Sequence, residues 1–329
     1  MSCSTALKLL APLCTCCLIA AAAIFIVPAL NDGSAALLSH GDLTSPRLLV
    51  SLGLMTASII GAALLWIQML QCLEQERVRG WPLLRLFLLT WPTRYVPGTV
   101  PYHATRLMFA QKAGATTGAI TTTAAYEAIL QAAAAALLGI GCTVAAINLG
   151  RSLSSAYVLA VIPFVALPLL LQPRSLLLVV NRILTLLGRA EISRAALLSS
   201  RQILAFLVSY AVLYSANGTA FYLLLRWLFD SDASIWLAIG AYNVAGAAGI
   251  AVLFVPSGLG VREAVLVGFM SSSLSPEQAL IAAGAARALT VIADLVPFAG
   301  LGLWELGTRT VRLSARVQLM RRAPSRVND

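Results

Sequence analysis

Charged residues are scarce in this chain, and their scarcity decides its class. Only 11% of the 329 residues are Asp, Glu, Lys or Arg, whereas 59% are hydrophobic. The mean hydropathy is +0.86, which excludes a soluble chain and is typical of an integral membrane protein. The net charge of +10 indicates positive-inside loops and no nucleic-acid partner, because the positive residues cluster between and after apolar runs.

The sequence also lacks the spacings that bind metals or activate nucleophiles. Its six cysteines form no pair of CxxC motifs, and no histidine stands at zinc spacing from them. We interpret them as small apolar residues in lipid. There is no glycine-rich phosphate loop and no nucleophile elbow. We therefore expect no metal, no cofactor and no enzymatic activity that depends on a known catalytic motif.

Apolar runs separated by short polar turns predict an all-α integral membrane protein, a polytopic helix bundle of about six to eight spans. The runs are 9–30, 48–72, 116–149, 156–171, 202–225, 235–255 and 279–304. We expect residues 1–329 to form a single transmembrane domain in the inner, cytoplasmic membrane.

Two arginine-rich segments indicate the orientation of the chain. Residues 174–201 have the helical spacing of an amphipathic segment on the cytoplasmic surface, where their arginines would touch anionic lipid. The alternative for this segment is a solvated positive-inside loop. The basic tail, 306–329, places the C-terminus in the cytoplasm.

An apolar run is broken at residues 254–266, FVPSGLGVREAVL. Because Pro256 removes a backbone donor and Gly258 and Gly260 permit unusual φ values, one helix should end near 255 and another should begin near Gly260. Backbone freed at membrane depth must face protein or a water-filled cavity, so we expect a cavity here. Arg262 and Glu263 indicate a functional site, because charge inside a membrane is costly. The alternative is an interfacial pair that caps a helix in a cytoplasmic loop.

A second break within 83–114 suggests an internal repeat. Its break residues and flanking charges are Arg94, Pro97, Gly98 and Arg106. Glu127 follows Pro97 by 30 positions (127 − 97), and Arg287 follows Pro256 by 31 (287 − 256). With the orientation above, the two broken or re-entrant segments, near 83–114 and 254–274, run oppositely, which predicts an inverted repeat with a midplane binding site. Whether 254–274 is re-entrant or crosses fully stays open.

These motifs carry a family resemblance. VPSGLGVRE, followed by an apolar piece, SPEQ and a long final helix, resembles the lysylphosphatidylglycerol synthase/flippase-like transmembrane family, which includes the membrane half of the multiple peptide resistance factor. RYVPG with a later basic turn and Glu127 is similar to that family's first motif. The chain ends about 25 residues after 304, so we expect neither the soluble aminoacyl-transfer domain of that factor nor lipid aminoacylation.

The resemblance implies re-entrant helices that handle a phospholipid or a polyprenyl-phosphate carrier. By position it points to Pro97, Gly98, Arg106, Glu127, Pro256, Gly258, Gly260 and Glu263.

From the charges we expect a flippase or transporter that binds an anionic lipid headgroup in a midplane cavity. Arg262, Arg287 and Arg106 would hold the phosphate, since an isolated ion cannot enter hydrocarbon unpaired. Glu127, Glu263 and Asp294 would balance the empty site or carry a coupling proton. A structural role is the alternative, because Arg287 lies two turns before Asp294 and can pair with it or with Glu127.

Two other function classes stay open. One is a polytopic lipid-linked transferase that uses the DxD formed by Asp230 and Asp232, although the loop around it is short. The other is an accessory subunit of a cell-envelope glycolipid pathway with a transferase partner. An enzyme should need the two aspartates, whereas a flippase should need Arg262, Glu263 and Arg287.

Overall fold

The structure is a computed structural model that describes residues 42–74, 78–95, 105–108, 110–111, 114–148, 197–230, 233–251 and 260–322, with the side chains of all of these except 147–148, 250–251 and 305–322. Within these ranges 88% of the residues are helical and none is in a strand, so the all-α class is confirmed. The expected spans 9–30 and 156–171 and the segment 174–196 lie outside the described residues.

Four described helices are long and apolar enough to cross a membrane. They are α2 (Pro46–Leu73), α5 (Thr117–Asn148), α8 (Ser200–Phe229) and the first part of α11 (Pro276–Arg322), as far as Trp304. Shorter elements lie between them: α3 (Gly80–Thr90), the 3-10 helix η1 (Trp91–Tyr95), α9 (Ile235–Ala251) and α10 (Val261–Met270). The spans expected at 48–72, 116–149, 202–225 and 279–304 agree with these helices to within a few residues.

Local signals explain where several helices begin. Ser199 and Gln202 form a reciprocal capping box at the start of α8. Ser275 and Gln278 exchange the same two contacts before α11, at 3.1 and 3.2 Å. Pro46 opens α2 at a position where its missing N–H costs nothing. Each cap satisfies donors that an apolar surrounding would leave unpaired.

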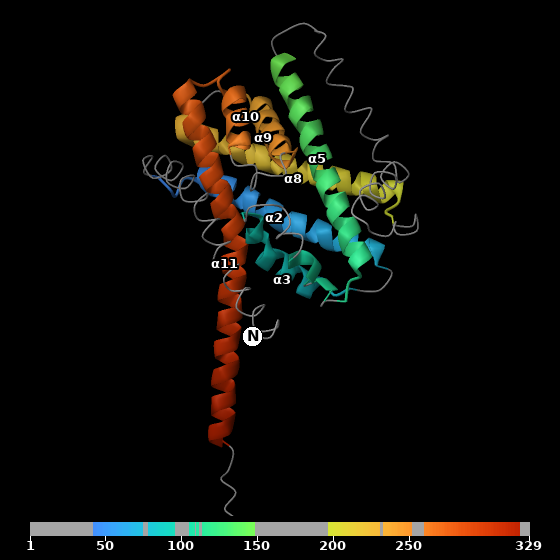
Figure 1. The fold of residues 1–329 in the computed structure, drawn as a ribbon. Helices are drawn as coiled ribbons and strands as arrows, with labels where there is room; N and C mark the ends of the chain where they lie inside the picture. Colours follow the sequence, from blue (N-terminus) through green and yellow to red (C-terminus); the bar gives the residue numbers. More distant parts are fainter. Residues whose placement is uncertain are drawn as a thin grey trace, which may run out of the picture.

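The order of elements repeats. A span (α2), a shorter helix (α3 with η1), a short helical piece (105–108) and a long helix (α5) are followed by the same series in α8, α9, α10 and α11. The packing repeats too: α2 lies against α8, while α5 packs on α8 and α9 and α11 packs on α2 and α3. In Figure 1, α5 runs upward and α11 downward, and α2 and α8 run in opposite directions. Equivalent helices are therefore antiparallel, as the inverted repeat predicts.

Small residues bring α5, α8 and α9 into close contact. A side-chain carbon at Gly240 would lie 2.8 Å from the Thr143 amide nitrogen, and one at Gly139 would lie 2.9 Å from that of Val244. Without a hydrophobic driving force between helices in lipid, such close backbone approach supplies the packing energy. α9 is thereby held at the centre of the molecule, where its Tyr242 is 6% exposed.

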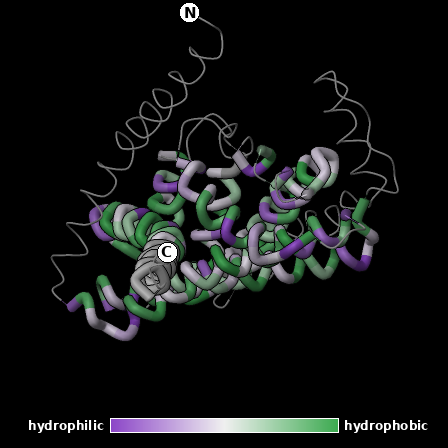
Figure 2. The backbone as a smooth tube through the Cα atoms, turned by 90° about the horizontal axis from the view of Figure 1, so that it is seen from below, coloured by the Kyte–Doolittle hydropathy of each residue, from purple (hydrophilic) through white to green (hydrophobic). Residues whose placement is uncertain are grey.

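The outer surface suits lipid. On α8 the exposed residues Leu204, Val208 and Val212 follow one another at one-turn spacing, so they line one outward face. Figure 2 shows hydrophobic residues along much of the helical tube, with hydrophilic residues in short stretches. One boundary differs from expectation: the predicted tail, 306–329, begins as a continuation of α11, which ends only at Arg322 (Figure 1).

Candidate functional site

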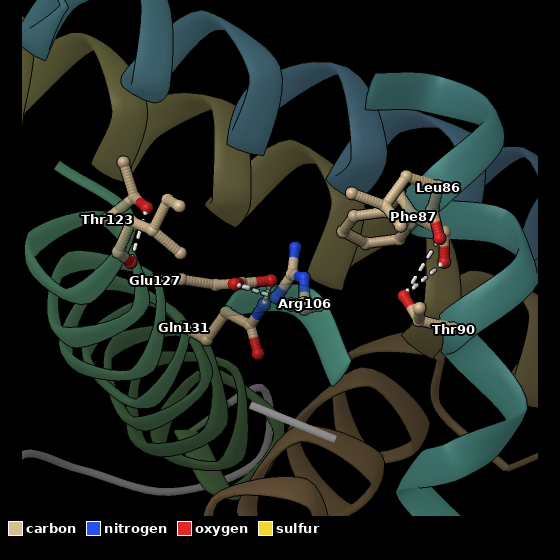
Figure 3. Close-up of polar contacts among 8 residues, drawn as sticks. Leu86, Phe87, Thr90, Arg106, Thr123, Glu127 and Gln131 are labelled. Atoms are coloured by element: carbon tan, nitrogen blue, oxygen red, sulfur yellow. Dashed lines mark hydrogen bonds and ion pairs between the residues drawn. The ribbon is translucent and has the colours of Figure 1, made fainter. Parts of the chain in front are cut away.

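The first half carries a buried ion pair between its short helical piece and its long helix. Nη1 of Arg106 lies 2.5 Å from Oε2 of Glu127, and the two side chains are 3% and 6% exposed. The Nε2 amide of Gln131 donates to the other Glu127 oxygen at 3.3 Å. The guanidinium also lies over the rings of Trp66 and Phe87, 4.4 Å from each. Figure 3 shows Glu127 and Gln131 reaching from α5 toward Arg106.

The second half carries a corresponding pair with the charges exchanged. Here the short helix α10 supplies the carboxylate, Glu263, and the long helix α11 supplies the cation, Arg287, whose Nε lies 3.8 Å from Glu263 Oε1. Glu263 Oε2 accepts the Gly260 N–H at 2.7 Å, and Gly260 has φ +79, a value that glycine adopts without a Cβ penalty. The Arg106–Glu127 contact is tight, whereas this one is longer than a hydrogen bond.

Three arginines come together where the two halves meet. Arg94 belongs to η1 of the first half, whereas Arg262 and Arg287 belong to α10 and α11 of the second. Arg287 lies within range of electrostatic repulsion from both of the others, and so does Arg262 from Arg94. We call these three residues, with Glu263 and Asp294, the arginine cluster. Among the described residues, the cluster thus contains three cations and two carboxylates.

Aromatic rings support every guanidinium of the arginine cluster. The contacts are Arg94 over Trp91 at 4.5 Å, Arg262 over Tyr242 at 4.4 Å and Arg287 over Tyr95 at 5.6 Å, each from Cζ to the ring centroid. A ring face attracts a cation without neutralising its charge. The rings therefore hold the arginines in place while leaving the positive potential of the cluster in force.

Asp294 binds neutral donors. Its Oδ1 accepts the Trp91 indole N–H at 2.9 Å, and its Oδ2 accepts the Tyr95 hydroxyl in a short hydrogen bond. These two donors lie about 200 residues earlier in the chain, and all three side chains are buried. The sequence left open whether Arg287 pairs with Asp294 or with Glu127. In the structure, Arg287 lies near Glu263, and Glu127 pairs with Arg106.

Arg287 lies well inside the apolar segment of α11 that is long enough to span a membrane. It stands eleven positions (287 − 276) after the start of this 29-residue segment at Pro276, or roughly 16 Å at 1.5 Å per residue. Trp304, at the other end, lies roughly 25 Å away by the same rise. Trp304 and Trp81 form an exposed edge-to-face pair, with centroids 5.6 Å apart, as expected of an interfacial belt.

The described site residues expected from the sequence lie in two groups. Arg106 and Glu127 form the first, and the second contains Gly260, Arg262, Glu263, Arg287 and Asp294. Pro97, Gly98, Pro256 and Gly258 lie outside the described residues.

Sequence reasoning missed the aromatic residues of the site. No motif in the sequence assigns Trp91 and Tyr95 to the site, yet both are buried and bind Asp294. Arg94 was recognised only as flanking a break. The available signal was their position directly before Pro97, at one-turn spacing. Tyr242 had no signal, because it lies in an uninterrupted apolar helix.

Asp230, the first residue of the DxD, has arginine partners. Its Oδ1 lies 3.0 Å from Arg47 and 3.8 Å from Arg226, and its side chain is 76% exposed. It ends α8 with φ +45, a conformation that aspartate tolerates better than most residues. Asp232 lies outside the described residues, and in the described part of the chain no three His, Cys, Asp or Glu side chains are grouped for a metal.

No protein-family model matches this chain, and no curated protein matches it.

Proposed function

We propose that this protein is a flippase- or transporter-like membrane protein that binds an anionic lipid headgroup at the arginine cluster. The observation that carries the proposal is the meeting of Arg94, Arg262 and Arg287, each supported by an aromatic ring, near the middle of a membrane-spanning bundle. The proposed location is the inner, cytoplasmic membrane, with the C-terminus in the cytoplasm. A phospholipid and a polyprenyl-phosphate carrier share the phosphate that the cluster would recognise.

The chemistry of guanidinium groups favours this ligand. Stacking on a ring occupies a face of the guanidinium plane, whereas its N–H donors point outward within the plane and match two oxygens of a phosphate. The oxygens of Asp294 are bound by Trp91 and Tyr95, and one Glu263 oxygen is bound by the Gly260 amide. These carboxylate oxygens are therefore engaged by neutral donors, and a bound phosphate would add negative charge beside the arginines.

The three arginines differ in how deeply they are buried. Arg287 is 4% exposed, whereas Arg94 and Arg262 are only partly buried. A headgroup would meet the two accessible arginines first, with Arg287 behind them. An isolated ion costs tens of kcal/mol to bury in a medium of low dielectric. Pairing with the three arginines would lower this cost and so allow the phosphate to leave the membrane interface.

The inverted repeat supports transport over simple binding. A ligand held between Arg94 of the first half and Arg262 of the second would bridge the two halves, so its binding and release would change how they pack. Sites at the boundary between inverted repeats serve alternating access in secondary transporters. The resemblance of the VPSGLGVRE and RYVPG motifs to a flippase-like family supports the same class of function.

The test is mass spectrometry of the lipids retained by the gently purified protein. Wild type is compared with Arg262→Ala and with Arg47→Ala, which removes an exposed arginine that pairs with Asp230. We expect one anionic lipid class to be enriched in wild type and in Arg47→Ala and to be lost in Arg262→Ala. If all three retain the same bulk lipids, the arginine cluster is not a headgroup site and the proposal fails.

A further inference from the structure

Tyr242 occupies an unusual position beneath the arginine cluster. One face of its ring is stacked on Phe221 of α8, with centroids 5.3 Å apart and planes inclined by 29°. The Arg262 guanidinium lies over the ring at 4.4 Å. The buried Tyr242 ring therefore contacts both an aromatic residue of the hydrophobic core and a charge of the cluster.

The Tyr242 hydroxyl is anchored to the helix that carries Arg287. It lies 3.2 Å from the Thr290 hydroxyl oxygen, and the Thr290 hydroxyl lies 2.7 Å from the Ala286 carbonyl. Thr290 has one hydroxyl proton, which it donates to that carbonyl, so its oxygen accepts from Tyr242. The ring is thus fixed at both ends, by stacking on α8 and by a hydrogen bond to α11.

The position of Arg262 in α10 is unfavourable for a cation, so support from the Tyr242 ring matters. Arg262 lies in the first turn of the ten-residue helix α10, where the helix dipole disfavours a cation. The neighbouring Glu263 uses one oxygen to cap Gly260 and has the other near Arg287. The ring of Tyr242 offers an attraction that does not depend on either carboxylate oxygen.

We propose that Tyr242 is a positioning residue that orients the Arg262 guanidinium toward the bound headgroup. The proposal rests on the function proposed above and adds a residue that no sequence motif marks. Its ring lies against the Arg262 guanidinium and so restricts the directions in which the N–H donors can point toward the phosphate. The property that matters is the flat aromatic face. The hydroxyl, which interacts with Arg262 and with Thr290, holds that face in register with α10 and α11.

The experiment measures the dissociation constant of phosphatidylglycerol, a lipid with one phosphodiester charge, for the full-length protein in detergent micelles. The variants are Tyr242→Phe, Tyr242→Leu and Tyr242→Met, each made alone and together with Arg262→Ala. We expect Leu and Met to weaken binding roughly threefold to tenfold, the range of one cation–π contact, and Phe to restore most of that loss. In the Arg262→Ala background, the Leu and Met changes should have no further effect.

Different failures have different meanings. If Arg262→Ala weakens binding but the Leu and Met variants bind like wild type, the proposed function stands and the positioning role is wrong. A Phe variant that binds as weakly as Leu, or a Leu effect that persists without Arg262, also overturns the positioning role. If Arg262→Ala itself binds like wild type, both proposals fail. Thermal unfolding without lipid identifies a misfolded variant, and Met, which fills the site flexibly, then carries the test in place of Leu.

Discussion

Removing the carboxylate of the Arg106–Glu127 pair should destabilise the protein more than any change at an exposed charge. Glu127→Gln keeps the size of the side chain but removes the carboxylate charge that faces the buried guanidinium of Arg106. The pair is 2.5 Å apart and its side chains are 3% and 6% exposed, so water cannot replace the carboxylate. Breaking a buried pair from one side costs about 3–5 kcal/mol, and we expect a loss in this range.

The rings around Arg106 limit the loss without cancelling it. Trp66 and Phe87 lie 4.4 Å from the guanidinium carbon, and each contact is worth about 0.5–2 kcal/mol. These contacts are already present in wild type, so they supply nothing new when the carboxylate is lost. The matched control is Asp230→Asn at the exposed pair with Arg47, which should cost about 1 kcal/mol or less.

The charge-exchanged double variant tests the same reasoning from the opposite side. Arg106→Glu with Glu127→Arg copies the arrangement of the second half, where α10 carries the carboxylate and α11 the cation. Stability should recover in part, because a buried pair is restored while the stacking on Trp66 and Phe87 is lost. The assay is the free energy of unfolding in detergent micelles. If Glu127→Gln lowers the free energy of unfolding by less than about 1 kcal/mol, as at the exposed control, then the pair is not shielded from water and the reasoning is refuted.

Two further predictions concern other parts of the fold. Gly240→Ala should destabilise the protein by about 1–3 kcal/mol, because the new carbon would lie 2.8 Å from the backbone of α5. Gly246→Ala in the same helix is the control, since open space surrounds that position, and it should be neutral or slightly stabilising. Thermal unfolding of both variants is the measurement. Asp294→Asn should lower the stability of the lipid-free protein by about 1–3 kcal/mol, because Trp91 and Tyr95 donate to different carboxylate oxygens and the substitution turns one of those acceptors into an NH2 donor. The same change removes a negative charge from the arginine cluster, so retention of anionic lipid should rise, and a fall in retention would contradict the charge balance argued above.

Much of the fold could be predicted because its signals are local. The length and hydropathy of a segment decide whether it can span a membrane, and both are properties of neighbouring residues. The helix start after the break at residues 254–266 was predicted near Gly260, and α10 begins at Val261. That boundary follows from glycine's freedom at φ +79 and from the Glu263 side chain three residues on.

The positions of the buried charges were also predictable, because a charge in an apolar run stands out in any sequence. Glu127 and Arg287 were identified at nearly equal distances after their breaks, and both are buried. Their partners were not identified. Whether Arg287 pairs with Asp294, Glu127 or Glu263 depends on how separate helices are rotated and packed, and helical spacing alone allows more than one answer.

By itself, then, the sequence determined an all-α membrane protein, most of the described helix boundaries and a short set of costly charges to be explained. Tertiary structure alone decided that Trp91 and Tyr95 reach Asp294, that Tyr242 lies under Arg262, and that the two halves carry ion pairs of exchanged charge. The physical reason is range. Hydrophobic length acts within one segment, whereas an ion pair or a stacked ring joins segments that may be 200 positions apart, and only packing brings them within 5 Å.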